Sequence, residues 1–250
     1  MTGRGRGGLS RRGFVAAAGG AVGLALLPEA ARAAARLVDP PQGLTILFQG
    51  DSITDCGCDR GVAEPNRAAA LGTGYPLLIA SALLEAHPDR GLRFFNRGVS
   101  GDKVPQLDAR WQADALDLRP DVVSVLVGVN DYWHTLNGTY AGTVQDYETG
   151  YAALLERTRS ALPGVRLVVI EPFVVRTGAV TDAWFPEFDR RREAAARVAR
   201  AAGATFLSAH QMFERLVRRA PPAYWAADGV HPTLAGHAAI ANRWLRAVRL

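Results

Sequence analysis

An aspartate and a histidine stand three residues apart near the end of the chain, at Asp228 and His231. On one loop, this spacing can place the carboxylate against Nδ1–H of the imidazole while Nε2 faces a hydroxyl from elsewhere, as a catalytic triad requires. Ser52 offers such a hydroxyl, because it follows Gly50 and Asp51 in a stretch where glycine permits a tight strand-to-helix turn. Each cluster also has a plainer interpretation: a helix-capping serine in a turn, and a surface pair or a metal site.

Two clusters rich in glycine and asparagine, at residues 96–102 and 128–131, could complete such a site. A serine that attacks an ester needs hydrogen-bond donors aimed at the oxygen that becomes negative. Glycine lets a backbone N–H approach that oxygen closely, and an asparagine side chain supplies an N–H without a net charge. Gly101 and Asn130 fit these two roles, although each taken singly also suits an ordinary loop.

The remaining residues of metal-ligand type are poorly placed for a metal site. The other four histidines are scattered without H-E-x-x-H or comparable spacing, at His87, His134, His210 and His237. Cys56 and Cys58 are separated by one residue, a spacing at which a disulfide is geometrically awkward, and no further cysteine or nearby histidine completes a metal or redox pair. We therefore expect two free thiols, no metal and no cofactor.

The elements that must position these clusters follow from the alternation of short apolar runs with longer amphipathic ones. This alternation is typical of strand-helix-strand units on a parallel sheet. Strands are predicted at residues 44–49, 92–96, 122–127, 166–170 and 205–208, and helices at 75–86, 104–115, 145–162, 186–202, 211–218 and 233–248. The expected fold is α/β, a three-layer α/β/α sandwich with a five-stranded parallel sheet. Such sheets bind ligands beyond the carboxyl ends of their strands, where the polar clusters fall.

The four clusters together, at residues 50–52, 96–101, 128–131 and 228–231, resemble the four sequence blocks of the SGNH (GDSL-like) hydrolases, in the same order. This resemblance implies the flavodoxin-like fold of that family. It also implies that Ser52 attacks the acyl carbon, that His231 takes its proton and that Asp228 orients His231. The oxyanion hole would consist of the Ser52 N–H, the Gly101 N–H and Asn130 Nδ2; the family pattern favours this glycine over Gly98.

Residues 48–55 and 130–134 are similar to the bacterial branch of this family that includes carbohydrate and acetyl-xylan-type esterases. The expected substrate is therefore a short acyl ester, above all an acetyl ester, on a small molecule or polysaccharide. Trp133 offers an aromatic face for a sugar ring, and Asp51 and His134 are further expected substrate contacts. Two alternatives stay open: a lysophospholipase or thioesterase for longer acyl chains, and a non-catalytic carbohydrate-binding protein on the same fold.

The first 33 residues have the composition of an export signal. Four arginines precede an apolar run at residues 14–27, and a small-x-small pattern follows at residues 31–33. The pair Arg11-Arg12 resembles the twin-arginine signal that a translocase reads. We predict a cleaved signal at 1–33, an SGNH hydrolase domain at 34–250, and a secreted protein. An uncleaved anchor and a basic nucleic-acid-binding arm are the alternatives.

Removal of residues 1–33 would lower the net charge of the protein and with it the case for a polyanionic partner. The whole chain carries a net charge of +5, from 29 basic and 24 acidic residues, but residues 34–250 hold 24 basic and 23 acidic residues, or +1. Polyanion binding needs a clustered excess of positive charge, so nucleic acid is not an expected partner. The apolar run is also shorter than the roughly 20 residues that span a bilayer, so no stable membrane insertion is expected.

Overall fold

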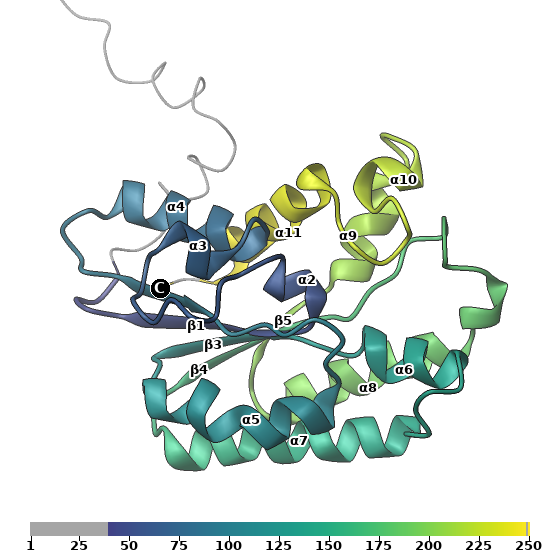
Figure 1. Ribbon diagram of the computed structural model, residues 1–250, viewed down its shortest axis with the longest axis horizontal. Helices are drawn as coiled ribbons and strands as arrows, with labels where there is room; N and C mark the ends of the chain where they lie inside the picture. The colour runs from purple at the N-terminus through teal and green to yellow at the C-terminus, as the bar shows by residue number, and fades with distance from the viewer. Residues whose placement is uncertain (1–39, 249) are drawn as a thin grey trace, which may run out of the picture.

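Five short strands lie side by side and parallel in the middle of the molecule (Figure 1). The computed structural model describes residues 40–248 and 250. The strands are β1 (Thr45–Gly50), β2 (Arg93–Asn96), β3 (Val122–Leu126), β4 (Arg166–Ile170) and β5 (Thr205–Leu207). Their order in the sheet is β2-β1-β3-β4-β5, the flavodoxin-like arrangement. The predicted five-stranded parallel sheet is confirmed, with each strand end within one residue of its predicted position.

Helices cover both faces of this sheet and complete the predicted three-layer sandwich (Figure 1). One layer contains α3 (Ala68–Leu71), α4 (Tyr75–Ala86), α9 (Ala209–Leu216), α10 (Pro222–Trp225) and α11 (Leu234–Ala247). The other contains α5 (Val104–Asp114), α6 (Val129–Leu136), α7 (Val144–Ala161) and α8 (Glu187–Ala201). All six predicted helices are present. The short helices α2 (Ser52–Asp55), α3, α6 and α10 were not predicted, nor were the 3-10 turns Leu116–Leu118 and Asp182–Trp184.

The alternation of side chains along β1 divides the core into two parts. Ile46 and Phe48 pack on the α4 and α11 side, whereas Leu47 packs on the α5 and α7 side. Two buried tryptophans satisfy their ring N–H groups within these layers: Trp244 donates to Ser124 Oγ at 3.0 Å, and Trp111 donates to Thr158 Oγ1 at 2.9 Å. Both layers are therefore fixed against the sheet by large apolar side chains whose polar atoms are paired.

The end of β1 turns sharply into α2, and Gly50 makes the turn possible. Its φ is +153°, and a Cβ at this position would lie 2.1 Å from the carbonyl oxygen of Leu126 on the neighbouring strand β3. Asp51 then caps α2 by accepting a hydrogen bond from the Ile53 N–H at 3.0 Å. As a result, Ser52 lies in a tight turn at the carboxyl end of the sheet, as the sequence predicted, and is the first residue of α2.

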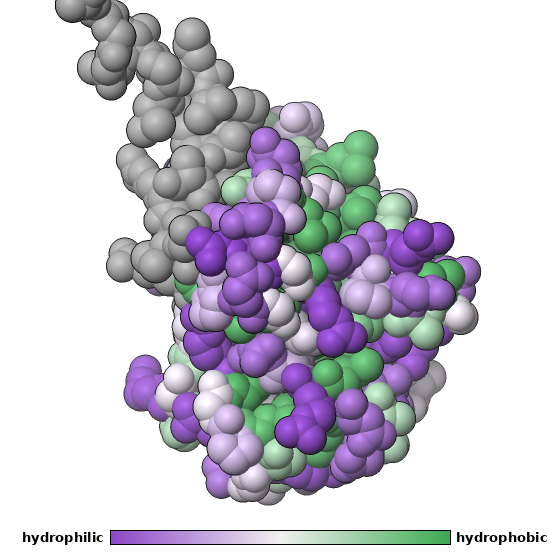
Figure 2. All heavy atoms as spheres, turned by 90° about the vertical axis from the view of Figure 1, so that its left-hand side faces the viewer, coloured by the Kyte–Doolittle hydropathy of each residue, from purple (hydrophilic) through white to green (hydrophobic). Residues whose placement is uncertain are grey.

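The surface on the left of Figure 1 mixes hydrophilic and hydrophobic residues, with hydrophilic ones predominating (Figure 2). The predicted export signal at residues 1–33 lies outside the described residues and stays a prediction. Among the described helices, none combines the length and the apolar character that a membrane crossing demands.

Candidate active site

Three side chains form a continuous line of hydrogen bonds at the carboxyl end of the sheet. Ser52 Oγ lies 2.9 Å from His231 Nε2, and His231 Nδ1 lies 2.6 Å from Asp228 Oδ2. Ser52 comes from the β1–α2 turn, whereas Asp228 and His231 come from the loop before α11. The His231 and Asp228 side chains are 43% and 42% exposed, so solvent and a ligand can reach them. This geometry lets a neutral imidazole take a proton from the serine hydroxyl.

The loop around Asp228 keeps its carboxyl group ionised. Oδ1 accepts hydrogen bonds from the backbone N–H groups of Val230 at 2.9 Å and His231 at 2.7 Å. Partial burial alone would raise the pKa of this carboxyl, but the His231 ring and these two N–H groups outweigh it and lower the pKa below its ordinary value. An ionised Asp228 fixes the orientation of the imidazole and stabilises it when it becomes protonated.

The Asp228 loop is held in turn by the connection that follows β4. The Val175 N–H donates to the Gly229 carbonyl at 2.8 Å, and the Ala179 N–H donates to the Asp228 carbonyl at 2.9 Å. Gly229 has a φ of +88°, and a Cβ there would lie 2.3 Å from the Thr177 carbonyl oxygen. The two chain segments therefore touch backbone to backbone beside the triad.

Three hydrogen-bond donors near Ser52 have no acceptor among the described residues. The backbone N–H of Ser52 and that of Gly101 donate to no described group. Asn130 is 5% exposed, and its side-chain amide donates one N–H to the Asp102 carbonyl at 3.2 Å, which leaves the second N–H without an acceptor among the described residues. These are the three donors that the sequence predicted for an oxyanion hole.

Arg110 of α5 joins the segments that carry these groups, a role that was not predicted from the sequence. Its guanidinium donates to Asp102 Oδ2 at 2.8 Å, to the Arg97 carbonyl at 2.7 Å and to Gln49 Oε1 at 2.9 Å. It also pairs with Asp114 at 3.0 Å on its own helix. Five donors in a rigid fork suit such a junction, and the side chain is only 18% exposed. Arg110 thereby connects β1 to the loop that carries Gly101.

Asp51 and Asp131 are buried carboxyl groups beneath the site. The structure places Asp51, which we expected to contact substrate, at 0% exposure with Oδ1 accepting from the Ile53 N–H, so its side chain has no surface for a substrate. Asp131 is 1% exposed and accepts from the Val104 N–H at 3.1 Å. Burial raises the pKa of each to about 7.

The other two expected substrate contacts, Trp133 and His134, are half-buried residues of α6. The Trp133 ring lies 6.2 Å from the His231 ring, centre to centre. His134 Nδ1 accepts a hydrogen bond from Lys103 Nζ at 3.1 Å. Partial burial and the neighbouring Lys103 charge lower the pKa of His134, so its ring is neutral with the proton on Nε2. Lys103 was not identified from the sequence.

Cys56 and Cys58 are free thiols, as predicted. Cys56 Sγ lies 3.4 Å from His237 Nε2, and His237 Nδ1 accepts the Tyr75 N–H at 3.2 Å, so Nε2 carries the proton that faces the sulfur. Burial lowers the pKa of His237 to about 4 and raises that of Cys58 to about 11. Because Nδ1 accepts the Tyr75 N–H and Nε2 already carries a proton, His237 cannot accept the proton of the Cys56 thiol. Cys56 and His237 therefore pack α2 against α11, and Cys56 is not activated as a second nucleophile.

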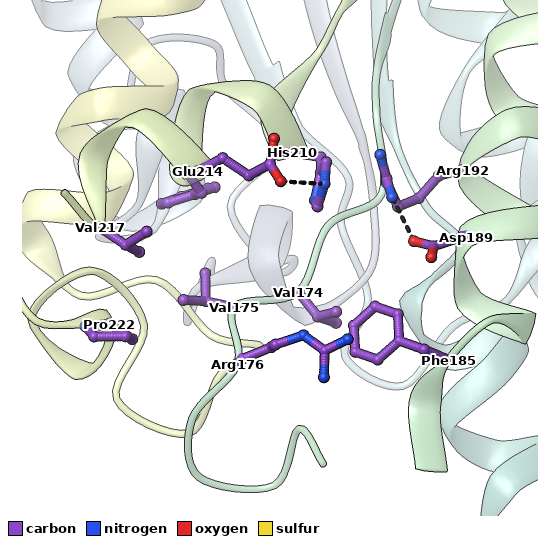
Figure 3. A pocket seen from close by; sticks show the side chains of 11 residues that line it. Val174, Val175, Arg176, Phe185, Asp189, Arg192, His210, Glu214, Val217 and Pro222 are labelled. Carbon is purple, nitrogen blue, oxygen red and sulfur yellow. Dashed lines mark hydrogen bonds and ion pairs between the residues drawn. The ribbon is translucent and has the colours of Figure 1, made fainter. Parts of the chain in front are cut away.

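A separate cavity of about 370 Å³ is bordered by the segment that follows β4 (Figure 3). Val174 and Val175 form part of its wall, and none of the triad residues lines it. Two pairs of its polar side chains bond to one another: His210 Nε2 lies 3.2 Å from Glu214 Oε1, and Arg192 pairs with Asp189. His210, one of the four scattered histidines, therefore lines this cavity and does not contact Ser52, Asp228 or His231.

Comparison with known proteins places this arrangement in a family. Residues 48–239 match the model of the GDSL-like lipase/acylhydrolase family, a span that includes Ser52, Gly101, Asn130, Asp228 and His231. The chain belongs to this family. It is accordingly a carboxylic ester hydrolase of the SGNH type, which confirms the resemblance seen in the sequence.

Individual members of the GDSL-like family are similar over most of the chain. An acetylxylan esterase from Geobacillus stearothermophilus is 32% identical over 210 residues, which cover 82% of this chain and 94% of that protein. Its solved structure matches with a TM-score of 0.73 at 30% identity, covering 84% of this chain and 96% of that one. A protein described as a GDSL-like lipase from Parabacteroides merdae matches with a TM-score of 0.82 at 44% identity, covering 84% and 98%.

Proposed function

We propose that this protein hydrolyses short-chain acyl esters, above all acetyl esters, carried on a carbohydrate. The observation that carries the proposal is the hydrogen-bonded line from Ser52 through His231 to Asp228, beside three unpaired donors. Two alternatives considered from the sequence are a hydrolase for longer acyl chains and a non-catalytic sugar-binding protein. An unbroken triad argues against the second, because binding alone needs no such alignment.

The geometry supports a two-step mechanism. Ser52 Oγ attacks the acyl carbon while His231 Nε2 accepts the serine proton, and the carbonyl oxygen, now negative, receives the N–H groups of Ser52, Gly101 and Asn130. The bond to the alcohol then breaks, and His231 returns the proton to the departing alcohol oxygen. In the second step a water molecule gives its proton to His231 and attacks the acyl group on Ser52. The bond from the acyl carbon to Ser52 Oγ then breaks, His231 returns the proton to Ser52 Oγ, and the carboxylic acid leaves.

The relatives support the carbohydrate part of this proposal. The acetylxylan esterase of G. stearothermophilus is named for acetyl groups on xylan, and solved structures of its catalytic mutants carry alanine in place of a serine or a histidine. In this chain Ser52 and His231 are the serine and histidine in contact. Export, predicted from residues 1–33, would also suit an extracellular polymer or its fragments.

The test compares p-nitrophenyl acetate with acetylated xylo-oligosaccharides as substrates of the purified protein. We expect hydrolysis of both, loss of both in Ser52→Ala, and covalent labelling by a fluorophosphonate that disappears in the same variant. Ser81→Ala is the matched control, because Ser81 is an exposed residue on the outer face of α4. Near-native turnover by Ser52→Ala would refute the assigned nucleophile, and cleavage of p-nitrophenyl acetate alone would refute the carbohydrate substrate.

A further inference from the structure

Lys103 is the only lysine in the chain, beside 28 arginines, and it is buried next to the candidate oxyanion hole. Lys103 is the next residue after Asp102, whose carbonyl accepts a hydrogen bond from the Asn130 amide. The residue is 7% exposed. A lysine ammonium is strongly hydrated in water, so its burial is costly unless acceptors replace the lost water. The position of this lysine therefore requires an explanation.

The described residues supply few partners for the Lys103 ammonium. Nζ donates to His134 Nδ1 at 3.1 Å and lies 5.1 Å above the ring of Tyr140. Neither of these two partners carries a negative charge. The Lys103 charge also acts on the buried Asp131 carboxyl, where it opposes the burial that raises the pKa of Asp131, but the two groups form no ion pair at contact distance. An ammonium has three N–H donors, so two of them are left for water or a ligand. His134 Nε2, which also carries a proton, has no described partner and is not sealed from solvent.

The order of residues on α6 shows which side of the site this polar pair occupies. At about 100° per residue, Trp133 is displaced about 60° to one side of Asn130 and His134 about 40° to the other. All three share one face of the helix, within one turn. Trp133 contacts His231, whereas His134 contacts Lys103. The two flanks of Asn130 therefore face different parts of a bound ester.

The direction of proton transfer indicates which part of the ester lies on each flank of Asn130. His231 must give its proton to the departing alcohol, so the alcohol lies on the flank of His231 and Trp133. The acyl chain extends from the opposite side of the carbonyl carbon. With Asn130 at the carbonyl oxygen, that side is the flank of His134 and Lys103.

We propose that Lys103 and His134 form a polar wall on the acyl side of the site that restricts the substrate to short acyl groups. The inference rests on the proposed function and names the residues that select its acyl group. An acetyl methyl ends before the wall and leaves the two remaining N–H groups of the ammonium free to bond to water. A longer alkyl chain would cover the ammonium and the His134 N–H with hydrocarbon, and neither group would recover a hydrogen-bond acceptor.

The test is the ratio of kcat/KM for p-nitrophenyl octanoate to that for p-nitrophenyl acetate. In Lys103→Met, which keeps the side-chain length but removes the charge, we expect this ratio to rise about 10-fold or more, mainly through a lower KM for octanoate. Lys103→Arg, which keeps the charge, should retain the preference for acetate, as should His134→Gln, which keeps both an acceptor and a donor. Circular dichroism verifies that each variant is folded.

The outcomes separate this inference from the esterase proposal. Two results would refute the proposed polar wall: a wild-type enzyme that cleaves p-nitrophenyl octanoate as readily as p-nitrophenyl acetate, or an unchanged ratio in Lys103→Met. Neither result would affect the assignment of Ser52 as nucleophile. A second readout uses protein labelled with 13C at the lysine Cε, which gives a single lysine signal because the chain has one lysine. Sodium acetate, as the reaction product, should shift this signal at concentrations that inhibit the enzyme. An unmoved signal at inhibiting concentrations would contradict the assignment.

Discussion

At the scale of single residues, Asn130 is the sharpest test of how the site stabilises negative charge. Its amide is buried and fixed by the Asp102 carbonyl, so one N–H points to a constant position without reorganisation. We expect Asn130→Ala to lower kcat by about 100- to 1,000-fold with little change in KM, the size found for loss of one oxyanion donor. Steady-state kinetics on p-nitrophenyl acetate measure both constants.

Asn137→Ala is the control for this substitution, because Asn137 is an exposed residue at the end of the same helix. It should leave kcat within about 2-fold of the wild-type value, as surface changes remote from chemistry do. A loss in Asn130→Ala that appeared only in KM would make Asn130 a contact for bound substrate instead of a donor to the transition state.

The residues of the candidate site divide into those that the sequence predicted and those that it could not. Ser52, Asp228 and His231 stand in local blocks, so their types and spacing suffice to suggest a triad. Arg110 gave no such signal, because its contact with Gln49 joins residues 61 positions apart. Lys103 was missed for a similar reason: its burial depends on how α5 and α6 meet in space.

At the scale of elements, Arg110 ties β1 and the Gly101 loop to α5. Loss of one member of a buried ion pair leaves the other charges without compensation. We therefore expect Arg110→Met to lower the free energy of unfolding by about 3–5 kcal/mol. Because the Asp102 carbonyl holds Asn130, kcat should fall as well. Urea unfolding and kinetics on the same preparation check both effects.

Arg157→Met provides the comparison, because Arg157 pairs with Asp108 on the exposed side of α5 and the two side chains are 42% and 55% exposed. Exposed pairs contribute about 0–1 kcal/mol, so this variant should be close to wild type in stability and activity. Equal losses in the two variants would show that Arg110 has no special role as a junction.

The elements themselves were predictable where hydrophobic periodicity is long and regular. All five strands and six of the helices (α4, α5, α7, α8, α9 and α11) follow from it. The helices α2 and α6 were not predicted, because each contains polar residues of the site in its first turn, where they suggest a loop. Their buried residues, such as Ile53 and Tyr132, acquire partners only from distant elements. At these two helices the polar residues that the site requires interrupt the hydrophobic periodicity by which a helix is predicted.

At the scale of the whole molecule, Asp51 and Asp131 connect stability with pH. The pKa of each is raised from 3.8 to about 7 by burial, so the folded protein holds protons that the unfolded chain releases. Stability from these groups is complete below about pH 4 and is lost as the pH rises through 7. We expect the free energy of unfolding to be lower at pH 8 than at pH 5, and Asp131→Asn to reduce this difference.

Urea unfolding at the two pH values measures the effect, with Asp117→Asn, an exposed residue, as the control. Asparagine keeps the oxygen that accepts the Val104 N–H and cannot ionise, so the variant should resemble the protonated wild type. An Asp131→Asn variant with the full pH dependence of the wild type would refute the assignment of the effect to this carboxyl.

The hydrogen bond between Ser52 and His231 spans 179 residues of the chain. A contact of this sequence separation forms late, because the entropy of closing so long a loop must first be offset by the packing of the segments between. Here those segments include four of the five strands and the helices on both faces. We therefore expect the hydrogen bond between Ser52 and His231 to form only after these segments have assembled. During refolding, the return of esterase activity would report the docking of α11 and its preceding loop, a stage later than the one that far-UV circular dichroism detects.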